Sequence, residues 1–235
     1  MSTNEAIIRF EAVSKSFGSK RVLQDVSFDI ARGSAFCILG RSGTGKSVTL
    51  KLMIGLLKPE QGRIFAEDQE ITALQARELP PVRKTMGFVF QNAALFDSLS
   101  VGENVAFPLR RHTHKPETEI KDRAREKLAQ VGLENEFDKM PADLSGGMRK
   151  RAGLARALAL DPSILLVDEP SAGLDPMTSA EIDRLLLNLK SERDTTLMVV
   201  THNIPSARRV GDEFVVMHEG DFIAHGTAKE PGLHN

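Results

Sequence analysis

The chain has 235 residues, a formal net charge of −1 at pH 7, 41% hydrophobic residues and 27% charged residues. This composition is ordinary for a globular protein, and the near-zero charge gives no long-range attraction to nucleic acid, so we expect no nucleic-acid partner. No apolar run reaches the ~18 residues that a membrane-spanning helix needs, and residues 1–5 lack the pattern of a signal peptide. We therefore expect a cytoplasmic protein that reaches a membrane only through a partner.

Strand patterns dominate the first part of the chain. Residues 8–12 and 26–30 alternate between apolar and polar side chains, which predicts two antiparallel, half-buried strands. The apolar run 35–39 predicts a buried strand, and its Cys37, the single cysteine, is expected to be a small buried apolar residue. Apolar residues at helical spacing then predict a helix over 46–57.

Residues 40–47 read Gly-Arg-Ser-Gly-Thr-Gly-Lys-Ser, between that strand and that helix. This spacing builds a cradle for phosphates, because the glycines let backbone N–H groups turn inward and the helix N-terminus attracts anions. Lys46 is predicted to give a mobile charge to the outer phosphates, and the Ser47 hydroxyl is predicted to hold Mg²⁺. A glycine-rich turn without a ligand is the alternative, which the flanking strand and helix disfavour.

The chain changes character after a short predicted strand at 87–90. Ser100 and Glu103 form a possible capping box for a helix that Pro108 is expected to end. A second helix is predicted over 120–131, closed by Gly132, and a third from Ser145 to about residue 160. Residues 91–160 are therefore expected to be a helical insertion.

Strands and helices alternate again from residue 161. The run 164–167 predicts a strand buried in a parallel sheet, and 197–200 predicts another that ends at Thr201-His202. Thr178 with Glu181 is predicted to cap the helix between them. Segments 214–218 and 222–225 flank Gly220 as a closing hairpin. The sequence thus predicts an α/β core, residues 1–90 and 161–235, with a helical insertion.

Asp168 and Glu169 follow the buried run 164–167. An acid at the carboxyl end of a parallel strand lies where open α/β sheets bind ligands. Asp168 is predicted to support Mg²⁺ opposite Ser47, and Glu169 to orient and deprotonate a water that attacks the γ-phosphate. The alternative is a pair of exposed acids at a strand end.

Leu144 to Met148 read Leu-Ser-Gly-Gly-Met. Ser145 is a good helix N-cap, and Gly146 and Gly147 leave backbone N–H groups bare, which makes a second candidate anion site. The simplest explanation is a head-to-tail pair, in which each nucleotide lies between residues 40–47 of one copy and the Ser145 helix of the other. An ordinary capped helix is the alternative, and the basic residues 149–151 are expected to form a solvated helix face.

These motifs, in this order, resemble the nucleotide-binding subunits of ABC transporters over nearly the whole chain. The matching segments are Gly40–Ser47 (Walker A), Gln91 (Q-loop), Leu144–Met148 (signature), Ile164–Glu169 (Walker B), Ser171–Asp175 (D-loop) and His202 (switch). The resemblance implies one ABC ATPase domain over 1–235. It also implies a P-loop NTPase (RecA-like) core with an N-terminal antiparallel β subdomain and an inserted helical subdomain, and hydrolysis of ATP with Mg²⁺ by two copies of the chain.

The resemblance also implies residue roles. Gln91 contacts Mg²⁺ and the water and senses the membrane partner, Asp175 links the two sites, and His202 contacts the γ-phosphate. Asn203 stands where the family usually has Asp. The expected catalytic residues are Lys46, Gln91, Glu169 and His202, and the expected metal ligands are Ser47, Gln91 and Asp168. Since the chain has no Tyr or Trp, Phe17 is expected to stack on adenine among the nucleotide contacts Phe17, Gly40, Arg41, Ser42, Gly43, Thr44, Gly45, Lys46, Ser47, Val48, Ser145 and Gly147.

Segments 45–51, 90–109 and 144–151 look like the ATPases of MCE-type lipid importers, the Mla and Mkl group. This likeness implies a transmembrane permease, a place on the cytoplasmic face of the inner membrane, and MCE or substrate-binding components reached through the permease. Phospholipid is the implied cargo. The apolar segment Ala93–Phe96 is expected to be exposed and to dock a short cytoplasmic helix of the permease, although these residues are alternatively plain core.

Three other functions are weighed against this one. The chain could serve another ABC importer, or act without a permease in cluster assembly or on DNA. A DNA-repair type needs long coiled-coil heptads before the signature and a translation-factor type needs two copies of the domain, and neither feature is visible in the sequence. A module that binds nucleotide without turnover is disfavoured by Glu169.

Overall fold

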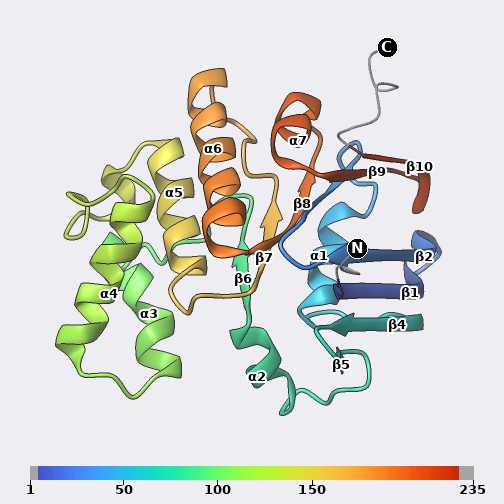
Figure 1. The fold of residues 1–235 in the computed structure, drawn as a ribbon, viewed down its shortest axis with the longest axis horizontal. Coiled ribbons are helices and arrows are strands. Elements are labelled where there is room, and N and C mark those ends of the chain that lie inside the picture. The colour runs from blue at the N-terminus through green and yellow to red at the C-terminus, as the bar shows by residue number, and fades with distance from the viewer. Residues whose placement is uncertain (1–4, 228–235) are drawn as a thin grey trace.

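The computed structural model describes residues 5–227; residues 1–4, on which most of the signal-peptide expectation rests, lie outside this range, as do 228–235. Helices and strands alternate along most of it (Figure 1). The strands are β1 (Ala6–Phe17), β2 (Lys20–Ala31), β3 (Ala35–Leu39), β4 (Gln61–Ala66), β5 (Gln69–Glu70), β6 (Met86–Val89), β7 (Ile164–Asp168), β8 (Thr196–Thr201), β9 (Glu213–His218) and β10 (Asp221–Thr227). The helices are α1 (Lys46–Met53), α2 (Leu79–Lys84), α3 (Val101–His112), α4 (Glu117–Gln130), α5 (Gly146–Ala157), α6 (Pro176–Arg193) and α7 (Ile204–Val210), with a 3₁₀ turn at Pro141–Asp143.

The strands form two sheets. One is antiparallel, in the order β2-β1-β4-β5, and the other has the order β10-β9-β3-β8-β7-β6, parallel except for β10. The predicted N-terminal strand pair is confirmed as β1 and β2, and the predicted hairpin as β9 and β10 around Gly220. The α/β fold with an antiparallel β subdomain and helices between β6 and β7 is therefore confirmed.

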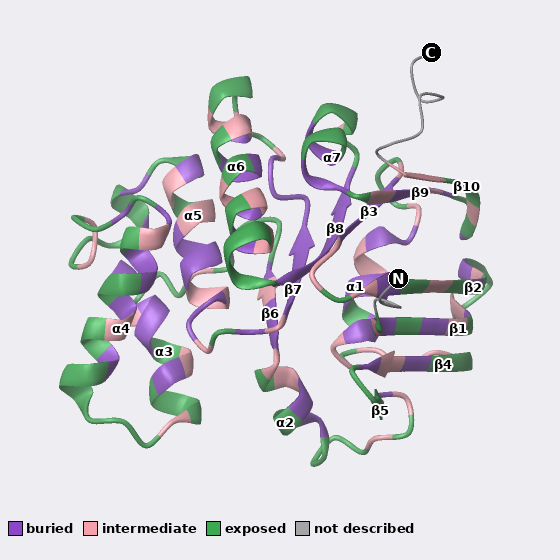
Figure 2. Cartoon of the chain, viewed as in Figure 1, coloured by how far each residue is buried: buried purple, intermediate pink, exposed green. Residues whose placement is uncertain are grey.

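In the parallel sheet, β7 and β8 are buried along their whole length (Figure 2), and so is β3. In β3, Phe36 and Ile38 face the core shared with the antiparallel sheet and α1, whereas Ala35, Cys37 and Leu39 face the core shared with α3–α7. Cys37 is fully buried as predicted, and this burial raises the pKa of its thiol to about 12. Two cores thus hold the sheet from both sides and fix the ends of its strands, where the predicted site lies.

The helical part lies beside the edge strand β6, with α3, α4 and α5 next to one another (Figure 1). The capping box at Ser100 and Glu103 is confirmed, but the expectation that Pro108 ends the helix is wrong, because α3 continues to His112. Proline removes one backbone hydrogen bond, whereas continuation of the helix beyond it buries Leu109. The subdomain boundaries at 91 and 160 stay a prediction.

Two other predicted helix ends differ from the structure. The helix that starts at Lys46 ends at Met53 rather than 57, because Gly55 takes a φ of +65° and the following N–H groups turn back to the carbonyl of Lys51. The predicted cap Thr178 lies inside α6, and Asp175 caps this helix instead, accepting hydrogen bonds from the N–H groups of Met177 and Thr178. Asp175 is the better cap because Pro176 follows it at the first helical position.

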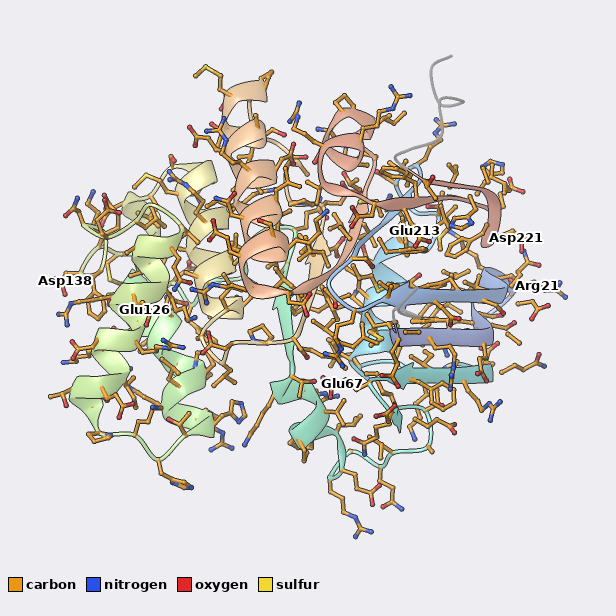
Figure 3. The ribbon with its side chains drawn as sticks, in the orientation of Figure 1. Arg21, Glu67, Glu126, Asp138, Glu213 and Asp221 are labelled. Atoms are coloured by element: carbon orange, nitrogen blue, oxygen red, sulfur yellow. The ribbon has the colours of Figure 1, made fainter. Side chains whose placement is uncertain are left out.

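Charged side chains project from the outside of both parts of the molecule. Glu126 and Asp138 extend from the helical part, and Arg21 and Asp221 from the strand-rich part (Figure 3). Among residues 5–227, no helix combines the length and the apolar character that a membrane crossing demands.

Candidate functional site

The loop between β3 and α1 is folded tightly around the ammonium group of Lys46. The residue is only 5% exposed, and its Nζ donates to the carbonyls of Gly40 (2.7 Å) and Arg41 (3.0 Å). Gly45 takes a φ of +112°, and a Cβ there would lie 2.6 Å from the carbonyl oxygen of Val22. Only glycine fits this position, so the loop geometry needs the residue that the motif places there.

Ser47, in the first turn of α1, contacts Asp168, the last residue of β7. The Ser47 hydroxyl donates to Oδ1 of Asp168 over 2.9 Å. Burial raises the pKa of Asp168, and the bond from Ser47 lowers it in part. A hydroxyl, a carboxylate and the nearby amide of Gln91 are hard oxygen donors of the kind Mg²⁺ takes together with phosphate and water. Within the described residues, no cluster of three or more His, Cys, Asp or Glu side chains could hold a metal by itself.

Glu169 lies directly after β7 with an unusual backbone, at a φ of +48°. Its Oε1 lies 3.2 Å from the Lys46 ammonium, and its Oε2 lies 2.8 Å from Nδ1 of His202 and accepts from the His202 N–H at 3.2 Å. A non-glycine residue in this region costs about 1–3 kcal/mol and persists only where its surroundings hold it. The strained backbone therefore lowers the stability of the fold slightly and places the Glu169 carboxylate between Lys46 and His202.

A cavity of about 350 Å³ collects most of the predicted residues. The predicted residues that line it are Phe17, Ser42, Gly43, Gly45, Lys46, Ser47, Val48, Gln91, Glu169 and His202. Four other predicted residues do not line it: Gly40, Arg41, Thr44 and Asp168. Hydrogen bonds from Lys46 to Gly40 and Arg41, from Ser47 to Asp168 and from Thr44 to Arg41 connect them to the lining.

The sequence missed two residues of the cavity lining, Lys20 and Val22. The charge of Lys20, close to Phe17, was a signal that could have indicated it. Val22 could not be found from the sequence, because its carbonyl meets Gly45 only through the tertiary fold.

Ser145 and Gly147 do not reach this cavity. Ser145 is exposed and caps α5 by accepting from the Met148 N–H at 3.2 Å. Gly147 is buried, and a Cβ there would lie 2.3 Å from Cγ2 of Thr178, so glycine is required for α5 to pack on α6. The exposed start of α5 is free to face a second copy, and the role of these two residues in nucleotide binding stays a prediction.

Comparison with known proteins identifies the family. The family model described as ABC transporter matches residues 23–172. The chain belongs to the ABC transporter family. This chain is 47% identical over 219 residues to the probable ribonucleotide transport ATP-binding protein mkl of Mycobacterium leprae. The match covers 93% of this chain and 63% of the relative. It therefore spans a little under two thirds of the length of the mycobacterial relatives.

Two further kinds of relative agree with this family. This chain is 39% identical to the intermembrane phospholipid transport system ATP-binding protein MlaF of Haemophilus influenzae. The match covers 97% of this chain and 86% of the relative. It is 33% identical to a solved dimer of the ATP-binding cassette MJ0796 in a post-hydrolysis state bound to ADP and Pi, with a TM-score of 0.88 and coverage of 95% and 99%. The protein cbiO1 of Clostridium perfringens, described as part of the ABC transporter complex cbiONQ, gives 34% identity, a TM-score of 0.87, and coverage of 96% and 90%.

The basic run after the signature, expected to be a solvated helix face, is exposed only at Arg149, whereas Lys150 and Arg151 are half-buried. Arg149 donates to the carbonyl of Leu144 (2.6 Å), Lys150 to that of Glu169 (3.1 Å), and Arg151 to that of Val131 (3.3 Å). These carbonyls lie at chain turns and helix ends, where the backbone leaves acceptor capacity that long basic side chains can fill.

Asn203 has a defined place despite its departure from the family's Asp. Its Oδ1 accepts from the Ser206 N–H (3.1 Å) and caps α7, and its Nδ2 donates to the Ser171 hydroxyl (3.3 Å). The amide thus joins the switch segment to the D-loop by a donated bond, which a carboxylate cannot make.

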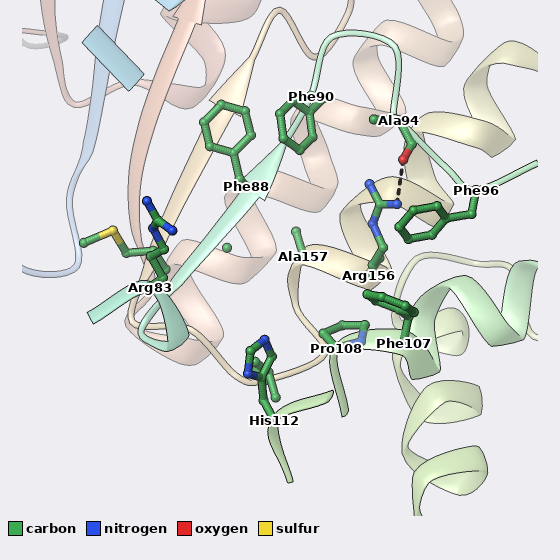
Figure 4. Close-up of a pocket in the computed structure, with 13 residues that line it drawn as sticks. Arg83, Phe88, Phe90, Ala94, Phe96, Phe107, Pro108, His112, Arg156 and Ala157 are labelled. Carbon is green, nitrogen blue, oxygen red and sulfur yellow. Dashed lines mark hydrogen bonds between the residues drawn. The ribbon is translucent and has the colours of Figure 1, made fainter. Parts of the chain in front are cut away.

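A second hollow of about 350 Å³ lies between β6 and the helical part (Figure 4). Its aromatic side chains Phe90, Phe96 and Phe107 are 38%, 44% and 43% exposed. Arg156 supports it by donating to the carbonyl of Ala94 over 2.7 Å. Ala93, expected to be exposed, is buried because it packs on Gly153. We call this aromatic hollow the Phe groove.

Proposed function

We propose that this chain binds and hydrolyses ATP as the energy-supplying subunit of an MCE-type phospholipid transport system. The observation that carries the proposal is the meeting of Lys46, the Ser47–Asp168 pair and the Glu169–His202 pair at one cavity. The likeness to the mkl and MlaF proteins supports the transport role. The test is ATP turnover by the purified chain, together with identification of the membrane proteins that co-purify with it.

The chemistry follows from the charges around the cavity. Backbone N–H groups of the loop and the Lys46 ammonium would bind the phosphates, and Phe17 would stack on the base. Mg²⁺ would be held by Ser47, Asp168 and Gln91 and would neutralise charge on the phosphate oxygens. The Glu169 carboxylate orients a water and accepts its proton, while His202 holds that carboxylate in place.

We expect Lys46→Ala to weaken ATP binding about 10–100-fold, because a charge-assisted contact to the phosphates is lost. The measurement is titration calorimetry with ATP and Mg²⁺. Lys58→Ala is the matched control, since Lys58 is an exposed lysine whose Nζ contacts the carbonyl of Leu74, away from the cavity. Unchanged affinity in Lys46→Ala would remove this lysine from the phosphate site.

The Phe groove supports a permease partner over a function without one. Phe96 and Phe107 pack with ring centroids 4.9 Å apart, and Arg156 lies 5.9 Å from the Phe96 ring. Exposed aromatic side chains around a hollow are typical of surfaces that bind a partner. The proposed occupant is a short cytoplasmic helix of the transmembrane permease, which would hold the chain on the cytoplasmic face of the membrane and link it to the MCE components.

We expect the double substitution Phe96→Asp with Phe107→Asp to abolish co-purification of membrane subunits, because two charges would enter an apolar contact. ATP turnover of the isolated chain should stay within about twofold of the parent. Ile223→Asp is the control, since Ile223 is another exposed apolar residue, on β10. Membrane subunits that still co-purify with the double variant would exclude the Phe groove as the docking surface, and a parent chain without any such subunit would favour the function without a permease.

A further inference from the structure

Lys150 connects the signature helix to the backbone of Glu169. It lies on α5, just over one turn beyond Ser145, and its Nζ donates to the Glu169 carbonyl over 3.1 Å. The side chain is partly buried, which lowers the pKa of the ammonium, and the nearby Glu169 charge opposes that shift. The bond therefore joins a charged donor to a carbonyl in a shielded place, where it is strong and directional.

The residue that Lys150 contacts is the one with the strained backbone. Three bonds hold the main chain of Glu169 near its φ of +48°. The Glu169 N–H donates to Val200 (2.9 Å), and its carbonyl accepts from the Ala172 N–H (3.2 Å) and from Lys150. The partners Val200 and Ala172 belong to the nucleotide-binding core, whereas Lys150 belongs to the helix that begins at the signature. A movement of α5 relative to the core therefore acts directly on this carbonyl.

We propose that Lys150 is a positioning residue through which α5 sets the orientation of the Glu169 carboxylate for ATP hydrolysis. This inference rests on the proposed function, in which Glu169 accepts the proton and the exposed start of α5 meets the nucleotide of a second copy. A helix moves as a rigid element, so a contact made at Ser145 displaces Lys150 together with it. Engagement of the signature end of α5 thus changes the orientation of the Glu169 carboxylate from the one that the single chain holds.

The position of Arg151 offers a matched comparison on the same helix. Arg151 also donates to carbonyls, but those of Val131 and Gly132, inside the helical part. If basic residues on α5 merely stabilise the fold, Lys150→Met and Arg151→Met should have similar effects on turnover. If Lys150 positions Glu169, the loss of turnover belongs to Lys150 alone.

The experiment measures steady-state ATP turnover of the full chain for Lys150→Met, Lys150→Arg, Arg151→Met and Glu169→Gln. We expect Lys150→Met to lower kcat about tenfold or more with KM for ATP within about twofold of the parent. Lys150→Arg, which keeps a charged donor, should recover most of kcat. Arg151→Met should lower the melting temperature and leave kcat within about twofold of the parent. A Lys150→Met variant with normal kcat, an equal loss in Arg151→Met, or no recovery in Lys150→Arg would overturn the inference.

Two further readouts keep the outcomes apart. If circular dichroism shows that Lys150→Met does not fold, Lys150→Gln is measured in its place. Its neutral amide is on a shorter side chain and cannot replace the ammonium at the Glu169 carbonyl. Normal kcat in Lys150→Gln would overturn the inference. Normal turnover in Glu169→Gln would instead show that the proposed role of Glu169 is wrong. Loss of turnover in Glu169→Gln with none in Lys150→Met would reject the coupling alone.

Discussion

Glu169→Gln is expected to lower ATP turnover by ~10²–10⁴-fold while leaving ATP binding intact, because the amide keeps the shape of the side chain but cannot accept a proton. In the structure the carboxylate already has the contacts that such a role needs. Its Oε2 is held by the His202 N–H and ring, and its Oε1 faces the Lys46 ammonium. The amide oxygen of the introduced glutamine can still accept from the His202 N–H, so the local fold should persist.

Single-turnover hydrolysis and calorimetric ATP binding, measured on the same preparation, separate chemistry from affinity. The chain offers a matched control in Glu213, which pairs with His225 on the neighbouring strands β9 and β10 (3.2 Å) outside the cavity. Glu213→Gln also removes one carboxylate from a Glu–His pair and should leave turnover within about twofold of the parent. Near-normal turnover in Glu169→Gln would require another group to take the proton from water.

Most of the elements that the sequence predicted, and the phosphate loop among the site residues, share one property: their geometry is local. A strand, a glycine-rich turn and a helix start follow one another at 35–47, so the phosphate loop is specified by contiguous residues. The capping box of Ser100 and Glu103 is likewise contained within one turn. Two predictions were wrong because another effect outweighed a local pattern. Pro108 is typical of a helix end, but burial continues α3 beyond it. Thr178 is typical of a helix cap, but Asp175 is the stronger cap of α6.

The features that the sequence could not predict depend on contacts between distant segments. Basic residues in a row usually form a solvated face, and only the fold shows that Lys150 lies beside Glu169. The same holds for Val22, whose carbonyl closes on Gly45, and for the exposure of Phe107 beside Phe96. Residue type gives the chemistry that a side chain can perform, whereas its partner is decided by topology.

Ser145→Arg is expected to prevent ATP-driven pairing of two copies and to lower turnover by ~10²-fold, because donors from the partner helix no longer reach the phosphates. Ser145 is exposed at the start of α5 and lies outside the cavity of its own chain. A long charged side chain there would occupy the space that the second copy needs. The measurement is light scattering with ATP in the Glu169→Gln background, where slow hydrolysis lets dimers accumulate.

The substitution also removes the N-cap of α5, which costs about 1 kcal/mol, so capping and pairing must be separated. Ser145→Asn keeps a capping oxygen, accepting from Met148 as Ser145 does, and reports whether the cap alone matters. Ser191→Arg adds the same charge at an exposed serine near the end of α6 and should pair normally. Dimers that persist in Ser145→Arg would mean that the α5 N-terminus faces solvent during turnover. Each chain would then have to complete the phosphate site with its own residues, leaving the exposed Ser145 cap without a role in catalysis.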